Sequence, residues 1–369
     1  MKKLSFVLML AVLSTSLVFA AGGRDRVREF RADAFWYSFA DTFLASVRAD
    51  MTAEFARAGV SVMHHDANNS QPTLVEQIRT AVIRGTDVLI VNIVTTGSED
   101  AAMTIVNIAR DANVPLLWFN REVSDAVVNS FPNSVFVGTD ADEAGVMQGQ
   151  AIANFLLRPA NWTGNRSNFD LDGDGFINYI MLRGEHGNAE AFGRTLYSVR
   201  EANRLLAPRG LTLRPSPANV NHSPMYPADG ISNYFLYANW SAAIANDLMN
   251  TALAAHSLTS GAIELIIANN DDAGLGAISA LNAHGFNTGA AGAGYIPVFG
   301  VDATAAAQEA IRAGRMTGTI LQDGAEMART ILYLAQNIEQ GRHMNHGIGT
   351  RFNVDAGVYK IRVPHAIFE

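Results

Sequence analysis

Short apolar runs alternate with longer amphipathic segments along most of the chain. Runs such as VLIVNIV and ELIIA are almost continuously apolar, which is typical of strands covered on both faces of a parallel sheet. The candidate strands span 35–38, 60–66, 87–94, 114–120, 134–140, 178–185, 211–216, 262–269, 295–302 and 316–322. The amphipathic segments, predicted as helices, include 42–58, 98–113, 141–158, 188–207 and 240–256.

This alternation of strand and helix predicts an α/β fold built from right-handed β–α–β units. Helices would then cover both faces of a doubly wound parallel sheet. About ten strands is roughly twice the usual number for one sheet. The sequence therefore predicts two parallel-sheet lobes of similar architecture, and a length of 369 residues is enough for both.

The first twenty residues have the pattern of a secretory signal. Lys2 and Lys3 precede an apolar run over 4–19, and Ala20 offers a small residue for a signal peptidase. The alternative is a membrane anchor, but a run of about sixteen residues is short of the roughly 20 that a spanning helix needs. We expect residues 1–20 to be a cleaved signal peptide and 21–29 to be a polar leader, so the product would be exported.

Composition narrows the classes of function. Hydrophobic residues make up 49% of the chain and charged residues 17%, as in a globular protein. The formal net charge of -8 argues against a nucleic-acid partner, because such a surface needs clustered cations. The chain contains no cysteine. Disulfides, thiolate nucleophiles, iron–sulfur ligation and a thioether lipid anchor are therefore excluded.

Polar side chains gather where the predicted strands end. In open α/β sheets, ligands bind at the carboxyl ends of the strands. Carboxylates, amides and a guanidinium can hydrogen-bond the hydroxyls around a sugar ring, while Phe43 and Trp240 offer flat apolar faces for its C–H groups. The alternative is that single Asn and Asp residues are turn formers or helix N-caps. The six polar strand ends are 37–41, 119–121, 184–190, 268–271, 300–302 and 321–323.

The segment DLDGDGFIN, residues 170–178, matches the first nine positions of an EF-hand calcium loop. Oxygen-bearing side chains stand at positions 1, 3, 5 and 9, with the required glycine at position 6 and a backbone carbonyl at position 7. Position 12 is Met181 instead of glutamate, and a strand is predicted where an exit helix would follow. A carboxylate from elsewhere in the chain would have to complete the site.

The chain resembles the galactose/glucose-binding proteins, periplasmic receptors of the type I fold that serve sugar ABC transporters. The resemblance covers nearly the whole chain after the signal and is densest in VPLLWFNRE, VFVGTD, DLDGDGFIN, IELIIANND, IPVFGVDA and GTILQD. It implies a non-catalytic receptor that binds galactose or glucose between its lobes and delivers it to a permease. The sugar-binding residues implied are Asp41, Phe43, Asn120, Arg121, Asn188, Glu190, Arg194, Trp240, Asn270, Asp302 and Gln322.

Four of these residues differ from the family pattern. Arg121 replaces a lysine, Asn188 and Glu190 stand where the family has His and Asp, and Gln322 replaces a shorter Asn. The family's calcium is completed by a glutamate six residues before a binding Asn, and Glu264 stands six residues before Asn270. The calcium ligands implied are Asp170, Asp172, Asp174, the Phe176 carbonyl, Asn178 and Glu264.

The resemblance also implies a three-segment hinge and discontinuous lobes. The expected N-terminal lobe is 30–139 plus 322–362, and the C-terminal lobe is 140–321 plus 363–369, with crossings near Thr139, Leu321 and Arg362. We expect the protein to be a monomer located in the periplasm. Besides the ABC permease, a chemoreceptor would be a second partner.

Parts of the sequence are also compatible with other classes of function. Sugar repressors share the lobe pair but begin with a DNA-binding helix-turn-helix, whereas this chain begins with a signal. In a glycosidase, Asp41 and Glu190 would be the two catalytic carboxylates. In a dinucleotide-binding enzyme, Gly274 and Gly276 would be the phosphate-binding glycines, but the full glycine motif is missing. His64 and His65 are metal-ligand candidates, but neighbours on a strand face opposite ways.

Overall fold

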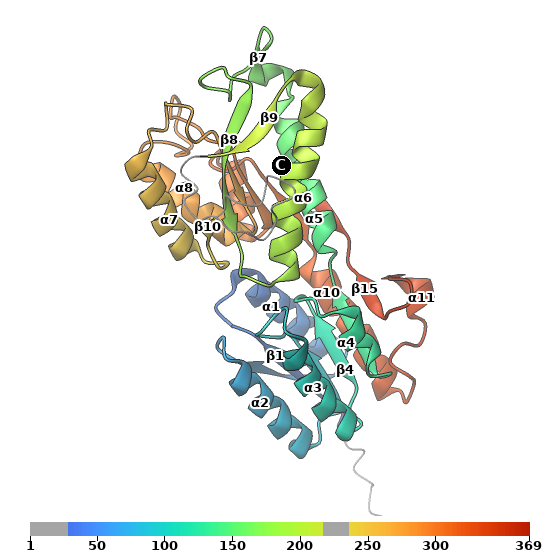
Figure 1. Ribbon diagram of the computed structural model, residues 1–369. Coiled ribbons are helices and arrows are strands. Elements are labelled where there is room, and N and C mark those ends of the chain that lie inside the picture. The colour runs from blue at the N-terminus through green and yellow to red at the C-terminus, as the bar shows by residue number, and fades with distance from the viewer. Residues whose placement is uncertain (1–28, 217–235) are drawn as a thin grey trace, which may run out of the picture.

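The computed structural model describes residues 29–216 and 236–369. The predicted signal peptide and most of the predicted leader lie outside the described residues. The described chain forms two lobes joined end to end (Figure 1), each built around a seven-stranded sheet. The expected α/β fold with two lobes is thereby confirmed. Among the described residues, no helix is long and apolar enough to span a bilayer.

The first lobe is built on a sheet of strand order β14-β15-β5-β4-β3-β1-β2. Its strands pair in parallel except for β14 and β15, which pair with each other in antiparallel register. The strands are β1 (Arg31–Trp36), β2 (Ser61–Asp66), β3 (Val88–Val91), β4 (Leu116–Phe119), β5 (Ser134–Gly138), β14 (Asn353–Val354) and β15 (Lys360–Arg362).

Successive residues of β3 face opposite sides of this sheet and enter two separate cores. Val88 and Ile90 pack with α1 (Thr42–Arg57) and α10 (Gly324–Glu339). Leu89 and Val91 pack on the other side. The helices of that side are α2 (Gln71–Arg84), α3 (Glu99–Asp111) and α4 (Asp125–Asn129). Burial on both faces explains why these strands are apolar throughout.

The second lobe repeats the arrangement with the order β10-β8-β11-β12-β13-β16, and β9 pairs with β8. Only β16 is antiparallel to its neighbour, β13. The strands are β8 (Phe176–Arg183), β9 (Thr212–Pro215), β10 (Leu236–Tyr237), β11 (Leu265–Ala268), β12 (Val298–Asp302), β13 (Gly318–Gln322) and β16 (His365–Phe368).

Helices again cover both faces of this sheet. On one face lie α5 (Ala141–Leu156) and α6 (Ala189–Leu206), and on the other α7 (Ala242–Ala255), α8 (Asp271–Ala283) and α9 (Ala305–Arg312). The remaining short elements are η1 (Pro159–Asn161), β6 (Trp162–Thr163), β7 (Arg166–Ser167), η2 (Ala207–Arg209) and α11 (Ile348–Arg351).

Within the described residues, the chain passes between the sheets after β5, after β13 and after β15. Gln322 is the last residue of β13, so it belongs to the second sheet and not to the return into the first lobe where it was expected. The short strands β14, β15 and β16 were not predicted, since they are two to four residues long and partly polar.

Candidate functional site

A small cavity lies between the two lobes at the carboxyl ends of their strands. Its volume is about 40 Å³, room for a few water molecules. All eleven residues predicted to bind sugar line this cavity, together with Tyr37. The structure thus brings together side chains that lie up to 281 positions apart in the sequence.

Three of the lining residues are also helix N-caps. The Asp41 carboxylate accepts the backbone N–H of Leu44 at the start of α1. Asn188 and Asn270 cap α6 and α8 in the same way. The capping interpretation considered from the sequence is therefore correct for these residues, and it does not compete with a binding role. A cap fixes the side chain where the helix N-terminus meets the cavity.

Three other lining residues have a backbone that L-amino acids rarely adopt. The φ angle is 59° at Asn120, 65° at Trp240 and 117° at Asp302. Positive φ costs a non-glycine residue conformational energy, and such residues cluster at functional sites where the surrounding structure holds them. Their presence around one cavity supports a binding role for it.

Tyr37 and Arg121 form the wall of the cavity on the first lobe. The Tyr37 hydroxyl donates a 2.6 Å hydrogen bond to Asp41 Oδ2. The Arg121 guanidinium lies over the Tyr37 ring at 3.6 Å and donates to the carbonyls of Ile93 and Val94. Arg121 is only 4% exposed. Its Nη1 is therefore engaged by the protein, whereas its buried Nη2 has no hydrogen-bond partner among the described residues and lies 3.1 Å from Glu185 Oε2.

Arg194 organises the wall on the second lobe. Its Nη1 donates to the carbonyl of Asn269 at 2.8 Å and lies 3.7 Å from Asp302 Oδ1. Its Nη2 donates to Gln322 Oε1, which also accepts the Thr139 hydroxyl. Burial raises the pKa of Asp302 well above its ordinary value, although the Arg194 charge opposes this. Arg194 and Asp302 thus present planar donor and acceptor groups to the cavity.

Glu190 connects the cavity to the opposite lobe. Its Oε1 accepts the backbone N–H of Glu122 at 3.0 Å, while its buried Oε2 has no partner among the described residues. Burial raises the pKa of the Glu190 carboxyl. An unpartnered buried oxygen beside a cavity is an acceptor that a hydroxyl group could satisfy.

Trp240 packs against a glycine that leaves room for its ring. A methyl group on Gly184 would lie 2.2 Å from the Trp240 ring, so only glycine fits there. The Arg194 guanidinium lies 5.9 Å from the ring centre on the same side of the cleft. Phe43, from the first turn of α1, and Tyr37 supply the other aromatic groups of the lining.

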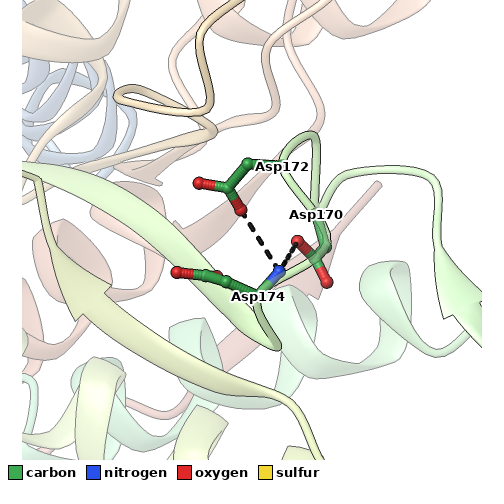
Figure 2. A group of neighbouring side chains, drawn as sticks. All are labelled: Asp170, Asp172 and Asp174. Carbon is green, nitrogen blue, oxygen red and sulfur yellow. Dashed lines mark hydrogen bonds between the residues drawn. The ribbon is translucent and has the colours of Figure 1, made fainter.

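The predicted calcium loop brings three carboxylates together at the edge of the second lobe (Figure 2). An oxygen from each of Asp170, Asp172 and Asp174 lies within 4.8 Å of the others. Asp170 is buried and accepts the backbone N–H groups of 173, 174 and 175. Glu264, distant in sequence, reaches the same loop and accepts the N–H groups of Leu171 and Asn178.

The side chains at this loop match most of what a calcium ion requires of its ligands. Three aspartate carboxylates converge, and Glu264 binds the backbone of the same loop. Burial, followed by the charges of Asp172 and Asp170, raises the pKa of Glu264 to about 7. Hard oxygen donors of this kind suit Ca²⁺. Asn178 is less free, because its Oδ1 accepts from Arg214 Nε and its Nδ2 donates to the Gly261 carbonyl. Arg214 also pairs with Asp174 at 2.8 Å. The acidic members fit the ion, and Asn178 fits it only if Arg214 moves.

Comparison with known proteins places this geometry in a family. Residues 34–343 match the model of the periplasmic binding protein domain. The chain belongs to this family. The D-galactose/methyl-galactoside binding periplasmic protein MglB of Haemophilus influenzae is 29% identical over 360 residues, covering 96% of this chain and 92% of the relative. A putative rhizopine-binding protein of Rhizobium meliloti is 26% identical and covers 86% of each chain.

The periplasmic binding protein fold is also seen among solved structures. The solute-binding protein of Actinobacillus succinogenes with bound D-allose superposes with a TM-score of 0.67 at 16% identity, covering 92% of this chain and 98% of that one. At this level of identity the likeness shows the fold alone. It confirms the predicted type I architecture.

The glycine pair and the histidine pair that the sequence offered as other sites have structural roles in this periplasmic binding protein. Gly274 and Gly276 lie inside α8, and a methyl group on Gly276 would be 2.1 Å from the Ala242 carbonyl of α7, so this glycine allows two helices to pack. His64 accepts from Trp36 Nε1, whereas His65 pairs with Asp33 at 2.6 Å. The two histidines therefore have separate partners, as their strand positions predict.

Proposed function

We propose that this chain is an exported, periplasmic receptor that binds D-galactose or D-glucose between its lobes and delivers it to an ABC permease. The observation that carries the proposal is an inter-lobe cavity whose lining includes all eleven predicted residues. This lining combines carboxylates, amides and two guanidinium groups with three aromatic rings. Periplasmic sugar receptors among the relatives support this assignment.

The size of the cavity supports a binding cycle with lobe movement. At about 40 Å³ the cavity is smaller than a hexose, which has twelve non-hydrogen atoms. The lobes must therefore part before a sugar can enter and close again around it. A ligand favours closure only through its greater affinity for the closed state. Contacts from both lobes, such as Asp41 on one and Arg194 on the other, supply that difference.

The absence of catalysis is part of the proposal. Both oxygens of Asp41 accept hydrogen bonds, from Leu44 N–H and from the Tyr37 hydroxyl. This carboxylate is therefore held as an acceptor and is poorly placed to act as a nucleophile. The permease would recognise the closed form, and a chemoreceptor that reads the same form is a second partner compatible with it. We infer that the protein acts as a monomer.

We also propose a structural calcium ion at the 170–178 loop. Asp170, Asp172, Asp174, the Phe176 carbonyl, Asn178 and Glu264 would hold it. When bound, the ion would neutralise the converging carboxylates and tie the loop to Glu264. The site is at the far edge of the second lobe from the sugar cavity, so no sugar contact depends on it.

Calorimetry of the purified protein without its signal peptide tests the receptor. We expect one hexose per chain with a Kd of about 1 μM or lower, which corresponds to about -8 kcal/mol. The panel should include galactose, glucose, xylose, allose and myo-inositol, because relatives and structural neighbours bind different ligands. Release of nitrophenol from an aryl glycoside, abolished by Asp41→Asn, would instead establish a glycosidase.

A further inference from the structure

The two lobes touch each other beside the sugar cavity through two glycine-containing loops. Residues 95–97 follow β3 in the first lobe, and residues 185–187 follow β8 in the second. A methyl group on Gly97 would lie 2.4 Å from the Gly187 carbonyl oxygen, far inside van der Waals contact. The two backbones can approach this closely only because position 97 has no side chain.

Polar contacts hold the same two loops together. Glu185 Oε1 accepts the Thr96 hydroxyl at 2.7 Å, and Glu185 Oε2 lies 3.1 Å from Arg121 Nη2. Thr96 and Arg121 belong to the first lobe, and Glu185 belongs to the second. The Arg121 side chain is 5% exposed and that of Glu185 29%, so this ion pair is largely shielded from solvent.

Glu185 does not line the cavity, but its partner Arg121 does. Arg121 in turn lies over the ring of Tyr37, whose hydroxyl binds Asp41. The contact between lobes is therefore connected to the cavity wall. On its other side the contact borders a wider cleft of about 670 Å³, which is lined by Thr96, Gly97 and Gly187 among others.

We propose that loops 95–97 and 185–187 form a clasp that keeps the closed arrangement populated before sugar arrives, with Glu185 as the positioning residue that holds Arg121. The proposal rests on the proposed function in one respect, since it assumes that closure matters for binding. Two further contacts between lobes support it: the Thr42 hydroxyl donates to Asp272 Oδ1, and Glu122 N–H donates to Glu190. None of these contacts requires a ligand.

The expected effect on affinity depends on the fraction of molecules that are closed before sugar binds. If only the closed form binds tightly, the apparent Kd equals the intrinsic Kd divided by the closed fraction. A clasp raises that fraction before binding. Loss of the clasp should therefore weaken sugar binding without removing any sugar contact.

The first test compares two glycine substitutions with matched backbone strain. Gly97 and Gly59 have φ angles of 71° and 74°, but a methyl group on Gly59 meets nothing within 4 Å. Gly97→Ala should increase the radius of gyration of the sugar-free protein in small-angle X-ray scattering and weaken hexose binding at least tenfold. Gly59→Ala should lower the melting temperature similarly and leave both quantities unchanged. Equal scattering from the wild type and Gly97→Ala would overturn the clasp.

The second test keeps the proposal falsifiable if Gly97→Ala does not fold. Glu185→Gln should open the sugar-free protein partly and weaken binding about three- to tenfold. Its control is Glu201→Gln on α6 of the same lobe, where the carboxylate bonds with Arg204 of its own helix and with Gln150 of the neighbouring helix α5. Unchanged scattering and affinity in Glu185→Gln would refute the role of Glu185. If the wild type binds no hexose, the receptor proposal fails, while the sugar-free scattering still decides the clasp.

Discussion

The Tyr37 hydroxyl lies 2.6 Å from Asp41 Oδ2 and donates a hydrogen bond to it, while the Leu44 N–H donates to the other oxygen of the same carboxylate. Asp41 is therefore fixed from two directions, by the end of β1 and by the first turn of α1. Burial raises the pKa of the Tyr37 phenol, so it remains a neutral donor over the whole working range of pH. A carboxylate held in this way presents its remaining lone pairs to the cavity in one orientation.

Asp41→Ala should weaken hexose binding by about 1.5–3 kcal/mol, as expected for the loss of a hydrogen bond to a charged group. It should also reduce any preference between glucose and galactose, if Asp41 contacts the 4-hydroxyl that distinguishes them. Asp41→Asn keeps the helix cap and separates the effect of charge from that of capping. Calorimetry with both sugars measures this, and unchanged affinities for both would show that Asp41 does not contact the ligand.

Gly184→Ala should weaken hexose binding about tenfold. The new methyl group would lie 2.2 Å from the Trp240 ring and would therefore displace the ring. Overpacking of this kind costs about 1–3 kcal/mol. The control is Gly349→Ala, where a methyl group meets nothing within 4 Å. Tryptophan fluorescence should report the altered ring in the first variant only. Full affinity in Gly184→Ala would mean that the position of Trp240 is not critical.

Removal of calcium with a chelator should lower the melting temperature of the protein. A ligand present at one hundred times its Kd stabilises the folded state by about 2.7 kcal/mol. Glu264→Gln should abolish most of the difference between calcium-loaded and chelated samples, and hexose affinity should change little. Differential scanning calorimetry with and without added calcium decides the matter. Identical melting after exhaustive chelation would leave the loop as a turn without metal.

Glu122→Gln should destabilise the protein by about 3 kcal/mol at neutral pH, the cost of breaking a mostly buried ion pair. Burial disfavours ionisation of Glu122, but hydrogen bonds and charges from Arg362 and Lys360 outweigh it and hold its pKa below the ordinary value. The stabilisation is therefore complete above the ordinary carboxyl pKa and is lost as the pH falls through the lowered value.

Urea unfolding of both proteins between pH 7 and pH 3 measures this dependence on Glu122. The difference in unfolding free energy between wild type and Glu122→Gln should shrink at the acid end. Glu339→Gln, at an exposed position at the end of α10, is the control and should show no such trend. A difference that stays constant with pH would mean that the ion pair contributes nothing measurable.

The sequence predicted the two-lobe α/β fold because the apolar strands and amphipathic helices carry their own periodicity. Eleven of the twelve residues that line the cavity were predicted. Eight of them are polar residues at strand ends, which are visible in the sequence, whereas Arg194 was implied only by the family resemblance. Tyr37 lies in the polar strand end 37–41 but was not predicted as a binding residue. The sequence could not show that Arg121 pairs with Glu185, because that contact depends on how the lobes meet. The bonds from Arg121 to two backbone carbonyls of its own lobe depend on the path of the chain after β3, which the sequence pattern does not give either.

The last ten residues give one strand to each lobe. β15 completes the first sheet beside β5, and only two residues later β16 pairs with β13 in the second. Neither sheet can be finished until residues 360–368 have been synthesised, and β15 pairs with a strand more than 220 positions earlier. Such distant pairing slows folding. A chain shortened by ten residues would lose strands from both lobes at once, so neither lobe can be obtained intact as a simple N-terminal fragment.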